Sequence, residues 1–554
     1  MTIWYQAGEV CIFQKSSPPQ CDYPSAPNIE PEQLCKIYCA TSPGPNYVYK
    51  HETVDSALNL ETWDNYRHII EPHDPTLIDQ LRFGFCMGID RTREVSIPYT
   101  NHRSAIEHYS VIDEFICKHY TSGAIAGPFR VNPLPVTIHP SPLQVATSSS
   151  GKHRAVIDMS YPYGASVNDA IPKDWKQIPG YSGEFRLPTH DQLCERVLDL
   201  EDPVMALTDL AAYYMQLPSD PQDWPFMVFS WRSAIWVHRR LPFGCRSACL
   251  HAQRVTEAVC RVHTSLTMYH VSGYVDDYLS INERPVSSHA HGRLHILIDD
   301  FGLARTEAKC VVPGDRRVGL GILYDMPARM LYLPEDKLTR ATDLIAEWLL
   351  KDQVNRAQVE SLVGFLNHVA TVVQAGRPFN SSLYDLLTQD QFPISLDHDI
   401  KQDLAMWHGF LLNSFTRCAA MKRCLTAPVD FEVALAVKQN SCVIRASEVN
   451  HGYNIVTDWK IPISLMPAVA VWLICEHHIT DIARKVVCVS VPSQVSARVI
   501  NRVSTKCNRI RPMLRRFWLR QAQADAYVKA VTATSNVGWL YGDFIEFKDV
   551  KFPY

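Results

Sequence analysis

Apolar residues recur at helical spacing over the first part of the chain. One stripe between residues 60 and 90 and another between 104 and 119 each fit one face of an amphipathic helix. Residues 1–50 carry scattered proline, serine and cysteine with little periodicity, and we expect them to be irregular. The pattern predicts a mainly helical N-terminal extension over residues 1–100.

Between residues 143 and 330 the pattern is mixed, because short apolar runs of strand length alternate with helical stretches. We predict strands over 154–158 and 204–208, a hairpin over 226–229 and 234–237, and a helix over 247–262. The run over 204–208 is largely apolar and leads directly into Asp209. Asp209 therefore stands at the end of a predicted strand.

From Pro334 onward the apolar period becomes that of a helix, which predicts helices over 337–350 and 359–373. The second helix is expected to end at Gly376-Arg377-Pro378. Residues 425–554 return to a mixed pattern, with a hairpin over 430–443, a strand over 486–490 and a helix over 511–525. The sequence shows no internal repeat and no low-complexity tract.

Composition narrows the class of protein. A chain of 554 residues that is 46% hydrophobic and 20% charged predicts a globular protein of roughly three to five domains. Its 17 cysteines include no Cys-x-x-Cys pair, which is typical of reduced thiols. Without a long apolar run or a signal-like N-terminus, we expect no membrane association and a cytoplasmic or nuclear location rather than secretion. The net charge of −4 argues only mildly against nucleic-acid binding, because a polymerase grips phosphates along one channel.

Three aspartates are the candidate chemistry. Asp276 and Asp277 follow Tyr274-Val275 in a predicted turn between two β-prone runs, and Asp209 ends another strand. Nucleotide polymerisation needs two divalent ions, and hard cations such as Mg²⁺ prefer carboxylate oxygens. The alternative is a solvated Asp-Asp turn, because a Tyr-x-Asp-Asp tetrapeptide by itself is weak evidence.

Further motifs give these aspartates a context. Over residues 58–387 the chain resembles the reverse transcriptases of tyrosine-recombinase retrotransposons, the DIRS and Ngaro-like group. The resembling motifs are Leu58-Asn59-Leu60, Ser104-Ala105-Ile106-Glu107-His108, Gly123-Ala124-Ile125-Ala126-Gly127-Pro128-Phe129, Ser166-Val167-Asn168-Asp169, Asp209-Leu210 through Leu217-Pro218, Leu241-Pro242-Phe243-Gly244, Tyr274-Val275-Asp276-Asp277 and Gly364-Phe365-Leu366-Asn367.

The resemblance implies a role for individual residues. Asp209, Asp276 and Asp277 match the catalytic triad that binds two Mg²⁺ ions, for which Mn²⁺ is an expected substitute. Tyr214 matches the steric gate that crowds a ribose 2′-OH, although a core tyrosine is the plain alternative. The other matches are Arg154 and Lys152 for the triphosphate, Phe243, Gly244 and Gln253 for the incoming nucleotide, Lys309 for the leaving pyrophosphate, and Tyr274 for nucleic acid. For Lys309 an exposed helix-end lysine is nearly as good an interpretation.

The sequence departs from the family pattern at three places. Residues 147–151 lack the lysines that usually precede the finger arginine, which predicts a weaker grip on the triphosphate. Tyr213 stands where a small residue usually backs the sugar pocket, and Ala248-Cys249 stands where small-Pro is common. These two differences predict a narrower pocket or altered fidelity, and they leave the metal site intact.

The C-terminal region has the layout of an RNase H domain, but the acidic residues expected at 434–437, 491–493 and 539–540 are absent. Without clustered carboxylates there is no metal site, so we expect a folded domain that does not cleave RNA. Arg509, Arg516 and Arg520 are interleaved with aromatic residues and are a candidate phosphate-tracking face. A solvated helix face is an equal alternative.

Together these observations predict an α+β right-hand polymerase followed by a degenerate RNase H-like α/β domain. The expected boundaries are 1–100 for the extension, 101–330 for fingers and palm, 331–390 for a helical thumb, 391–424 for a connection and 425–554 for the last domain. The resemblance implies an RNA-directed DNA polymerase that uses an RNA template, a DNA primer, an RNA–DNA hybrid and dNTPs, and it leaves room for element-encoded or host protein partners. The alternatives are a co-opted non-catalytic nucleic-acid-binding scaffold and a polymerase with altered template or nucleotide use.

Overall fold

The computed structural model describes most of the chain, in two compact units. One unit is drawn from residues 1–188 and 206–313, and the other from 189–205 and 314–554. The backbone is described for residues 3–6, 9–12, 24–40, 54–95, 100–148, 151–181, 183, 185–414, 416–422, 433–438, 441–446, 449–456, 462–483, 486–491, 493–502, 507, 510–524, 526–532 and 544–547. The first unit runs to residue 313, and the finer five-part division stays a prediction.

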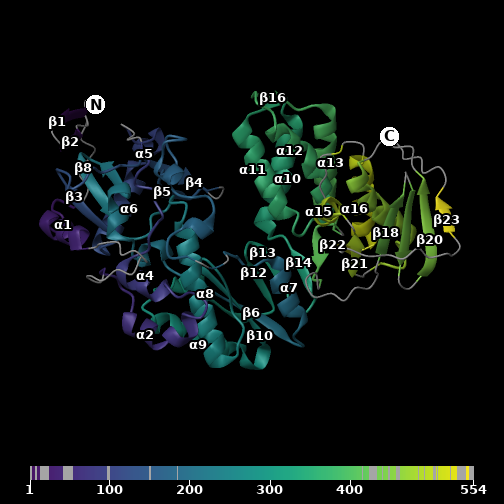
Figure 1. Ribbon diagram of the computed structural model, residues 1–554, viewed down its shortest axis with the longest axis horizontal. Helices are drawn as coiled ribbons and strands as arrows, with labels where there is room; N and C mark the ends of the chain where they lie inside the picture. Colours follow the sequence, from purple (N-terminus) through teal and green to yellow (C-terminus); the bar gives the residue numbers. More distant parts are fainter. Residues whose placement is uncertain are drawn as a thin grey trace. The chain divides into compact units, whose positions relative to one another are not determined.

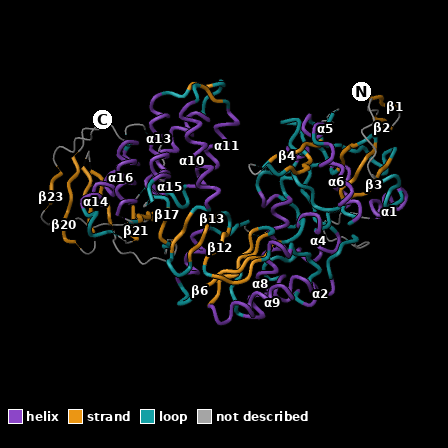
Figure 2. The backbone as a smooth tube through the Cα atoms, turned by 180° about the vertical axis from the view of Figure 1, so that it is seen from behind, coloured by secondary structure: helices purple, strands orange, loops and turns teal. Residues whose placement is uncertain are grey.

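The first unit contains a four-stranded sheet, here called the central sheet, whose strands β6 and β10 are labelled in Figure 1. Its strands lie in the order β11 (Val311–Gly314), β6 (Pro203–Asp209), β10 (Asp277–Glu283) and β9 (Ser272–Tyr274). Helices α8 (Ala248–Thr267) and α9 (Arg284–Asp300) pack beside this sheet and against each other (Figure 2). The predicted strand before Asp209 and the helix over 247–262 are confirmed.

A second sheet of this unit has the order β3 (Ile125–Phe129), β8 (Ala234–His238) and β7 (Val228–Trp231). The predicted hairpin is therefore present, with Trp231 opposite Ala234. Beside it, β4 (Leu143–Thr147) pairs antiparallel with β5 (His153–Ile157), which contains Arg154. Helices α5 (Arg103–Glu107) and α6 (Tyr109–Thr121) cover these strands.

The N-terminal helices belong to the core of the first unit. They are α1 (Pro31–Ala40), α2 (Leu60–Asn65), α3 (Arg67–Ile70) and α4 (Leu77–Phe83). The expectation that residues 1–50 are irregular is wrong at α1, where the fully buried Leu34 supplies the tertiary contact that a weak local pattern lacked. Trp63 shows how close the packing is, because its ring lies 3.9 Å from that of Phe301 and its indole N–H donates to the Phe301 carbonyl at 3.1 Å.

The second unit begins with an antiparallel sheet in the order β12 (Arg316–Gly319), β13 (Ile322–Asp325), β14 (Met330–Tyr332) and β17 (Cys418–Ala420). The segment predicted to form the thumb and connection contains α10 (Glu335–Leu350), α11 (Arg356–Val369), α12 (Ser381–Leu387) and α13 (His398–Leu412). Helix α11 ends at Val369, before the predicted end at Gly376. Gly376 lies instead in a separate 3-10 helix over Gln374–Asn380.

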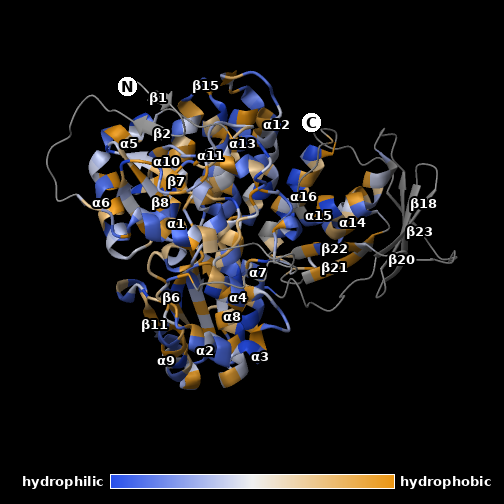
Figure 3. Cartoon of the chain, turned by 60° about the vertical axis from the view of Figure 1, so that its left-hand side comes forward, coloured by the Kyte–Doolittle hydropathy of each residue, from blue (hydrophilic) through white to orange (hydrophobic). Residues whose placement is uncertain are grey.

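The C-terminal part has a mixed α/β arrangement, as predicted. Its elements are β18 (Val433–Lys438), β19 (Ser441–Ala446), β20 (Val449–Val456), α14 (Met466–His477), β21 (Val486–Val491), α15 (Gln494–Arg502), α16 (Arg511–Ala524), β22 (Tyr527–Thr532) and β23 (Phe544–Phe547). Strands β21 and β22 pair in parallel and are mostly hydrophobic (Figure 3), and the core lies between them and the helices. None of the helices in the described residues is long and apolar enough to span a membrane.

Candidate active site

The Tyr274–Asp277 segment is a tight hairpin turn at the edge of the central sheet. Tyr274 lies opposite Asp277 in the β9–β10 pair, so Val275 and Asp276 form the whole connection. Val275 adopts φ +53°, a left-handed conformation that is unfavourable for a β-branched side chain. Such a turn persists only where surrounding groups hold it, and helix α8 supplies those groups.

Two α8 side chains hold the turn. The amide oxygen of Gln253 accepts from the Val275 N–H at 2.8 Å, and its nitrogen donates to the Gly273 carbonyl at 3.0 Å. The Thr256 hydroxyl donates to the Val275 carbonyl. A Cβ on Gly273 would lie 2.2 Å from Cγ2 of Thr256, so only glycine lets the hairpin approach α8 this closely. The carboxylates of the turn are therefore rigidly placed.

Asp209 meets this turn from the neighbouring strand. The Leu210 N–H donates to the Asp276 carbonyl at 2.9 Å, which places the end of β6 directly beside the hairpin. The Asp209 side chain is buried, and its Oδ2 accepts from Nζ of Lys309 at 2.7 Å. Its Oδ1 has no hydrogen-bond partner among the described residues. A buried carboxylate oxygen without a partner is costly unless something else binds it.

Reduced solvation and the neighbouring carboxylates raise the pKa of both aspartates of the turn. Reduced solvation, together with the charges of Asp276 and Asp209, raises the pKa of Asp277 to about 6. Reduced solvation and the charge of Asp209 also raise the pKa of Asp276, whereas Lys309 and Arg154 lower it. A bound divalent cation would offset the repulsion between these carboxylates and would give the buried Asp209 oxygen a partner.

A network behind Asp209 was not visible in the sequence. Arg305 donates from Nη1 to Nδ1 of His295 at 2.9 Å and lies 3.0 Å from Asp299, while Nε2 of His295 lies 2.9 Å from the Thr208 hydroxyl. Because arginine is always a donor, Nδ1 of His295 is the acceptor and Nε2 carries the hydrogen that Thr208 accepts. The network ties β6 to the segment that carries Lys309. No local pattern distinguishes His295 from an ordinary helix residue.

Tyr214 and Phe243 form an aromatic pair near the aspartates. Their ring centroids are 4.8 Å apart at 87°, Phe243 is 41% exposed and Tyr214 is half-buried. Burial and the neighbouring Cys249 raise the pKa of Tyr214, so its hydroxyl stays protonated, and the charge of Asp276 contributes to the same shift. The aromatic pair therefore lies within electrostatic reach of Asp276.

Gly244 and Asn168 connect two of the motifs on which the resemblance rests. Gly244 adopts φ +103°, and a Cβ there would lie 2.1 Å from the Ile157 carbonyl oxygen. Asn168 donates to the Gly244 carbonyl at 2.7 Å and accepts from the Arg246 N–H at 2.8 Å. Asn168 therefore positions the Phe243-Gly244 loop. The Ser166–Asp169 motif pointed to this residue without indicating its task.

The predicted triphosphate contacts lie on the β4–β5 hairpin. Arg154 is exposed on β5 opposite Ala146, and its charge lowers the pKa of Asp276, which places it within electrostatic range of the aspartates. Lys152 is also exposed, and its backbone N–H donates to the Ser148 hydroxyl at 3.0 Å in the turn before β5. Both side chains therefore face solvent.

The structure bears on two of the sequence interpretations. Both ends of the Gln253 amide bind hairpin backbone, so its observed task is to position the aspartates, and a nucleotide contact stays a prediction. Tyr213 was predicted to give a narrower pocket or altered fidelity, which stays a prediction. The structure shows its side chain buried against α8, where its hydroxyl lies 2.9 Å from both the Ala252 carbonyl and the Thr256 hydroxyl. Strand-like alternation did not reveal which of two adjacent tyrosines would face inward.

The candidate phosphate-tracking face on α16 is only partly available. Phe517 and Trp518 are buried in the C-terminal core, so the expected interleaving of exposed aromatic residues is wrong. Arg516 forms an ion pair with Glu476 of α14 at 2.6 Å, whereas Arg520 is exposed. Arg509 lies outside the described residues. Tyr274, the remaining predicted nucleic-acid contact, is half-buried at the end of β9.

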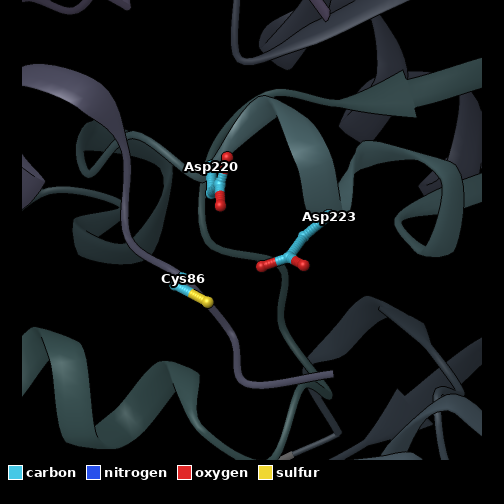
Figure 4. Close-up of side chains that lie close together, drawn as sticks. All are labelled: Cys86, Asp220 and Asp223. Carbon is cyan, nitrogen blue, oxygen red and sulfur yellow. The ribbon is translucent and has the colours of Figure 1, made fainter. Parts of the chain in front are cut away.

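A second cluster of ligand-type side chains lies away from the aspartates. Cys86, Asp220 and Asp223 bring possible ligand atoms within 4.8 Å of one another (Figure 4). Arg91 already supplies the positive charge, because its Nη2 lies 2.9 Å from Asp223 and 3.9 Å from Asp220. Asp223 also accepts from the Met87 N–H at 2.7 Å. This cluster is a buried ion pair rather than a metal centre.

The fold and the site agree with the arrangement expected from the sequence. One carboxylate ends strand β6 and two more lie in the adjacent β9–β10 hairpin, beside helices α8 and α9, which is the layout predicted for a polymerase palm. The α+β fold class predicted from the sequence is confirmed, with a mixed α/β part after the palm.

Comparison with known proteins gives distant similarity only. No family model and no curated protein matches the chain. Among solved structures it is similar to a foamy viral protease-reverse transcriptase in complex with an RNA/DNA hybrid, with TM-score 0.49, 13% identity and coverage of 97% of this chain and 67% of that one. It is also similar to that protein in complex with dsDNA, with TM-score 0.46, 15% identity and coverage of 93% and 96%. Neither names a DIRS- or Ngaro-like element.

Proposed function

We propose that the protein is an RNA-directed DNA polymerase that transfers deoxynucleotides to a primer 3′-OH. The observation that carries this proposal is the meeting of Asp209 with the Asp276–Asp277 turn, with one buried oxygen of Asp209 left without a partner. When bound, two Mg²⁺ ions would activate the primer hydroxyl and neutralise charge on the triphosphate. Asp209, Asp276 and Asp277 would hold them.

Other side chains supply binding and proton transfer. Arg154, with Lys152, would contact phosphate oxygens, since guanidinium matches them in two-point geometry. Lys309 would protonate the leaving pyrophosphate, and its side chain is 61% exposed while its ammonium contacts Asp209. Tyr214 and Phe243 would line the sugar of the incoming nucleotide. In the resting state Lys309 neutralises part of the aspartate cluster.

The proposal extends to the origin of the chain. The motif order supports a retroelement polymerase of the DIRS or Ngaro-like kind, or a gene derived from one, with RNase H activity lost. RNA template, DNA primer, RNA–DNA hybrid and dNTPs would be its partners, in the cytoplasm or the nucleus. The competing proposal is a non-catalytic nucleic-acid-binding scaffold, which the missing lysines at 147–151 favour.

The deciding experiment is primer extension by the full-length protein. A labelled DNA primer annealed to an RNA template is incubated with dNTPs and Mg²⁺ or Mn²⁺, and products are resolved by length. Extension that needs a divalent ion supports the polymerase. Tight binding of the primer–template without extension under either ion supports the scaffold instead.

Replacing Tyr214 by alanine is expected to relax the choice of sugar. Removing the ring opens space where a ribose 2′-OH would lie, so the ratio of dNTP to rNTP incorporation should fall by about ten- to a hundredfold, as expected for roughly 1.4–2.8 kcal/mol of steric discrimination. Single-nucleotide kcat/KM values for dATP and ATP measure it. Tyr213→Phe is the matched control, because that side chain faces α8, and it should keep the wild-type ratio. An unchanged ratio in Tyr214→Ala would remove Tyr214 from the sugar pocket.

The raised pKa of Asp277 predicts how Mg²⁺ binding depends on pH. Its ordinary value is 3.8 and its value in the fold is about 6, so ionisation of the folded protein is disfavoured and the metal-free protein loses stability as pH rises from about 4 to about 6. Mg²⁺ offsets the repulsion only when the carboxylates are ionised. The Mg²⁺-induced rise in Tm should therefore be larger at pH 7.5 than at pH 5, measured by differential scanning fluorimetry. In Asp277→Asn the Mg²⁺-induced rise in Tm should differ less between pH 7.5 and pH 5. An undiminished difference would assign the pH dependence to other groups.

A further inference from the structure

Two consecutive arginines of the first unit are buried directly after strand β8. Arg239 is 6% exposed and Arg240 is 4% exposed. Their backbone fixes them there, because the Arg239 N–H donates to the Ala124 carbonyl at 2.9 Å and the Arg239 carbonyl accepts from the Ser219 N–H at 3.2 Å. Arginine is seldom this buried without a partner, because its charge cannot be neutralised by losing a proton.

The described partners of these guanidinium groups are few and weak. Nη2 of Arg239 lies 3.9 Å from the carboxylate of Asp55, whose side chain is 79% exposed. Nη1 donates to the Gly123 carbonyl at 3.4 Å, and the buried Nε has no hydrogen-bond partner among the described residues. Among the same described residues, the Arg240 guanidinium donates one hydrogen bond, to the Arg239 carbonyl at 3.3 Å. The Arg239 guanidinium also lies over the Trp224 ring, 5.9 Å from its centroid. Among the described residues, Asp55 is thus the one carboxylate near these two positive charges, and it is loosely held.

Other buried arginines in the same unit are fully paired. Arg254 is 5% exposed and contacts both oxygens of Asp74 at 2.7 and 2.8 Å. Arg232 forms an ion pair with the buried Asp113. By contrast, burial and the charge of Arg239 lower the pKa of Arg240 to about 10, against a slight opposing effect of Asp55. Compared with Arg254 and Arg232, Arg239 and Arg240 therefore have little counter-charge among the described residues.

We infer that Arg239 and Arg240 form an anion site that binds a phosphate group. A tetrahedral oxyanion has enough acceptor oxygens to use donors from two guanidinium groups, whereas the single planar carboxylate of Asp55 lies at the edge of hydrogen-bond reach. The group is either free phosphate or a phosphate of a nucleic-acid backbone, because both present the same oxygens. Asp55 competes with the anion for Arg239. The site is separate from the aspartates and adds to the proposed function.

The test compares three full-length variants by differential scanning fluorimetry in inorganic phosphate, with chloride of matched ionic strength as reference. In wild type, about 50 mM phosphate should raise Tm by about 2 °C or more above chloride, as for a ligand well above its Kd. Arg240→Gln should abolish that rise. Asp55→Asn should lower the phosphate concentration needed for half the effect by about threefold, because a competing negative charge is removed.

The same variants exclude a folding artefact. Arg240→Gln removes an uncompensated buried charge, so its Tm in chloride should equal or exceed that of wild type. Arg103→Gln, at a side chain that is 90% exposed, should keep the wild-type response to phosphate. A short single-stranded DNA that reproduces the rise at micromolar concentration identifies a backbone phosphate, and a rise with phosphate alone identifies the free ion. No rise above chloride in wild type, or an equal rise in Arg240→Gln, would overturn the site.

Discussion

Asp276→Asn is expected to reduce Mg²⁺-dependent primer extension by on the order of 10³-fold or more, since the loss of one carboxylate ligand removes several kcal/mol of charge stabilisation. The residue lies in the two-residue turn and its carbonyl is hydrogen-bonded to Leu210. The substitution keeps the shape of the side chain and the backbone bonds of the turn. Single-turnover extension of a DNA primer on an RNA template measures the loss.

The fold should survive this change. Because the pKa of Asp276 is raised, its charge opposes folding, and Asp276→Asn should leave Tm equal to or above that of metal-free wild type. Asp300→Asn, at an exposed carboxylate near the end of α9, is the matched control and should extend primers normally. Equal extension by Asp276→Asn and wild type would end the assignment of the metal site.

Arg254→Met is expected to lower the free energy of unfolding by about 3–5 kcal/mol, the usual cost of breaking a buried ion pair from one side. Arg254 lies on α8 and binds Asp74 at both oxygens, Gln80 at 2.8 Å and the Thr76 hydroxyl at 2.9 Å. These partners lie in and before α4, so the arginine joins the N-terminal helices to the helix that holds the Asp276–Asp277 turn. Urea unfolding followed by intrinsic tryptophan fluorescence measures the change.

Arg261→Met is the control for this prediction. Arg261 lies on the same helix, is 42% exposed and is 3.7 Å from Glu257, so its removal should cost less than about 1 kcal/mol. Similar losses for the two variants would mean that the Asp74 pair contributes no more than a surface contact. The N-terminal helices would then be an appendage rather than part of the core.

The sequence indicated much of the palm. The strand before Asp209, the hairpin around Asp276 and the helix that became α8 are each encoded by residues close together in the chain. Alternation and apolar runs reflect burial of one element's own face, so they can be read locally. In the C-terminal part, strand β21 and helix α16 were also predicted from local pattern. The contacts of their side chains were not.

Side-chain partners distant in the sequence were not predicted. His295 and Arg305 lie many residues from Thr208, and no spacing rule joins them. Arg516 pairs with Glu476 on another helix, so its charge is not available in the way that the sequence of α16 suggested. A helix face rich in arginine and aromatic residues looks the same in sequence whether it faces solvent or a core.

By itself the sequence determined which segments form strands and helices, and that three carboxylates stand where strands end or turn. Only the tertiary structure decided that Gln253 and Thr256 hold the turn, that Tyr213 faces inward, and that Arg239 and Arg240 are buried with little counter-charge. The physical reason is the separation along the chain of the residues that interact. Secondary structure follows from near neighbours, whereas hydrogen-bond partners and burial depend on which distant segments the fold brings within a few ångströms.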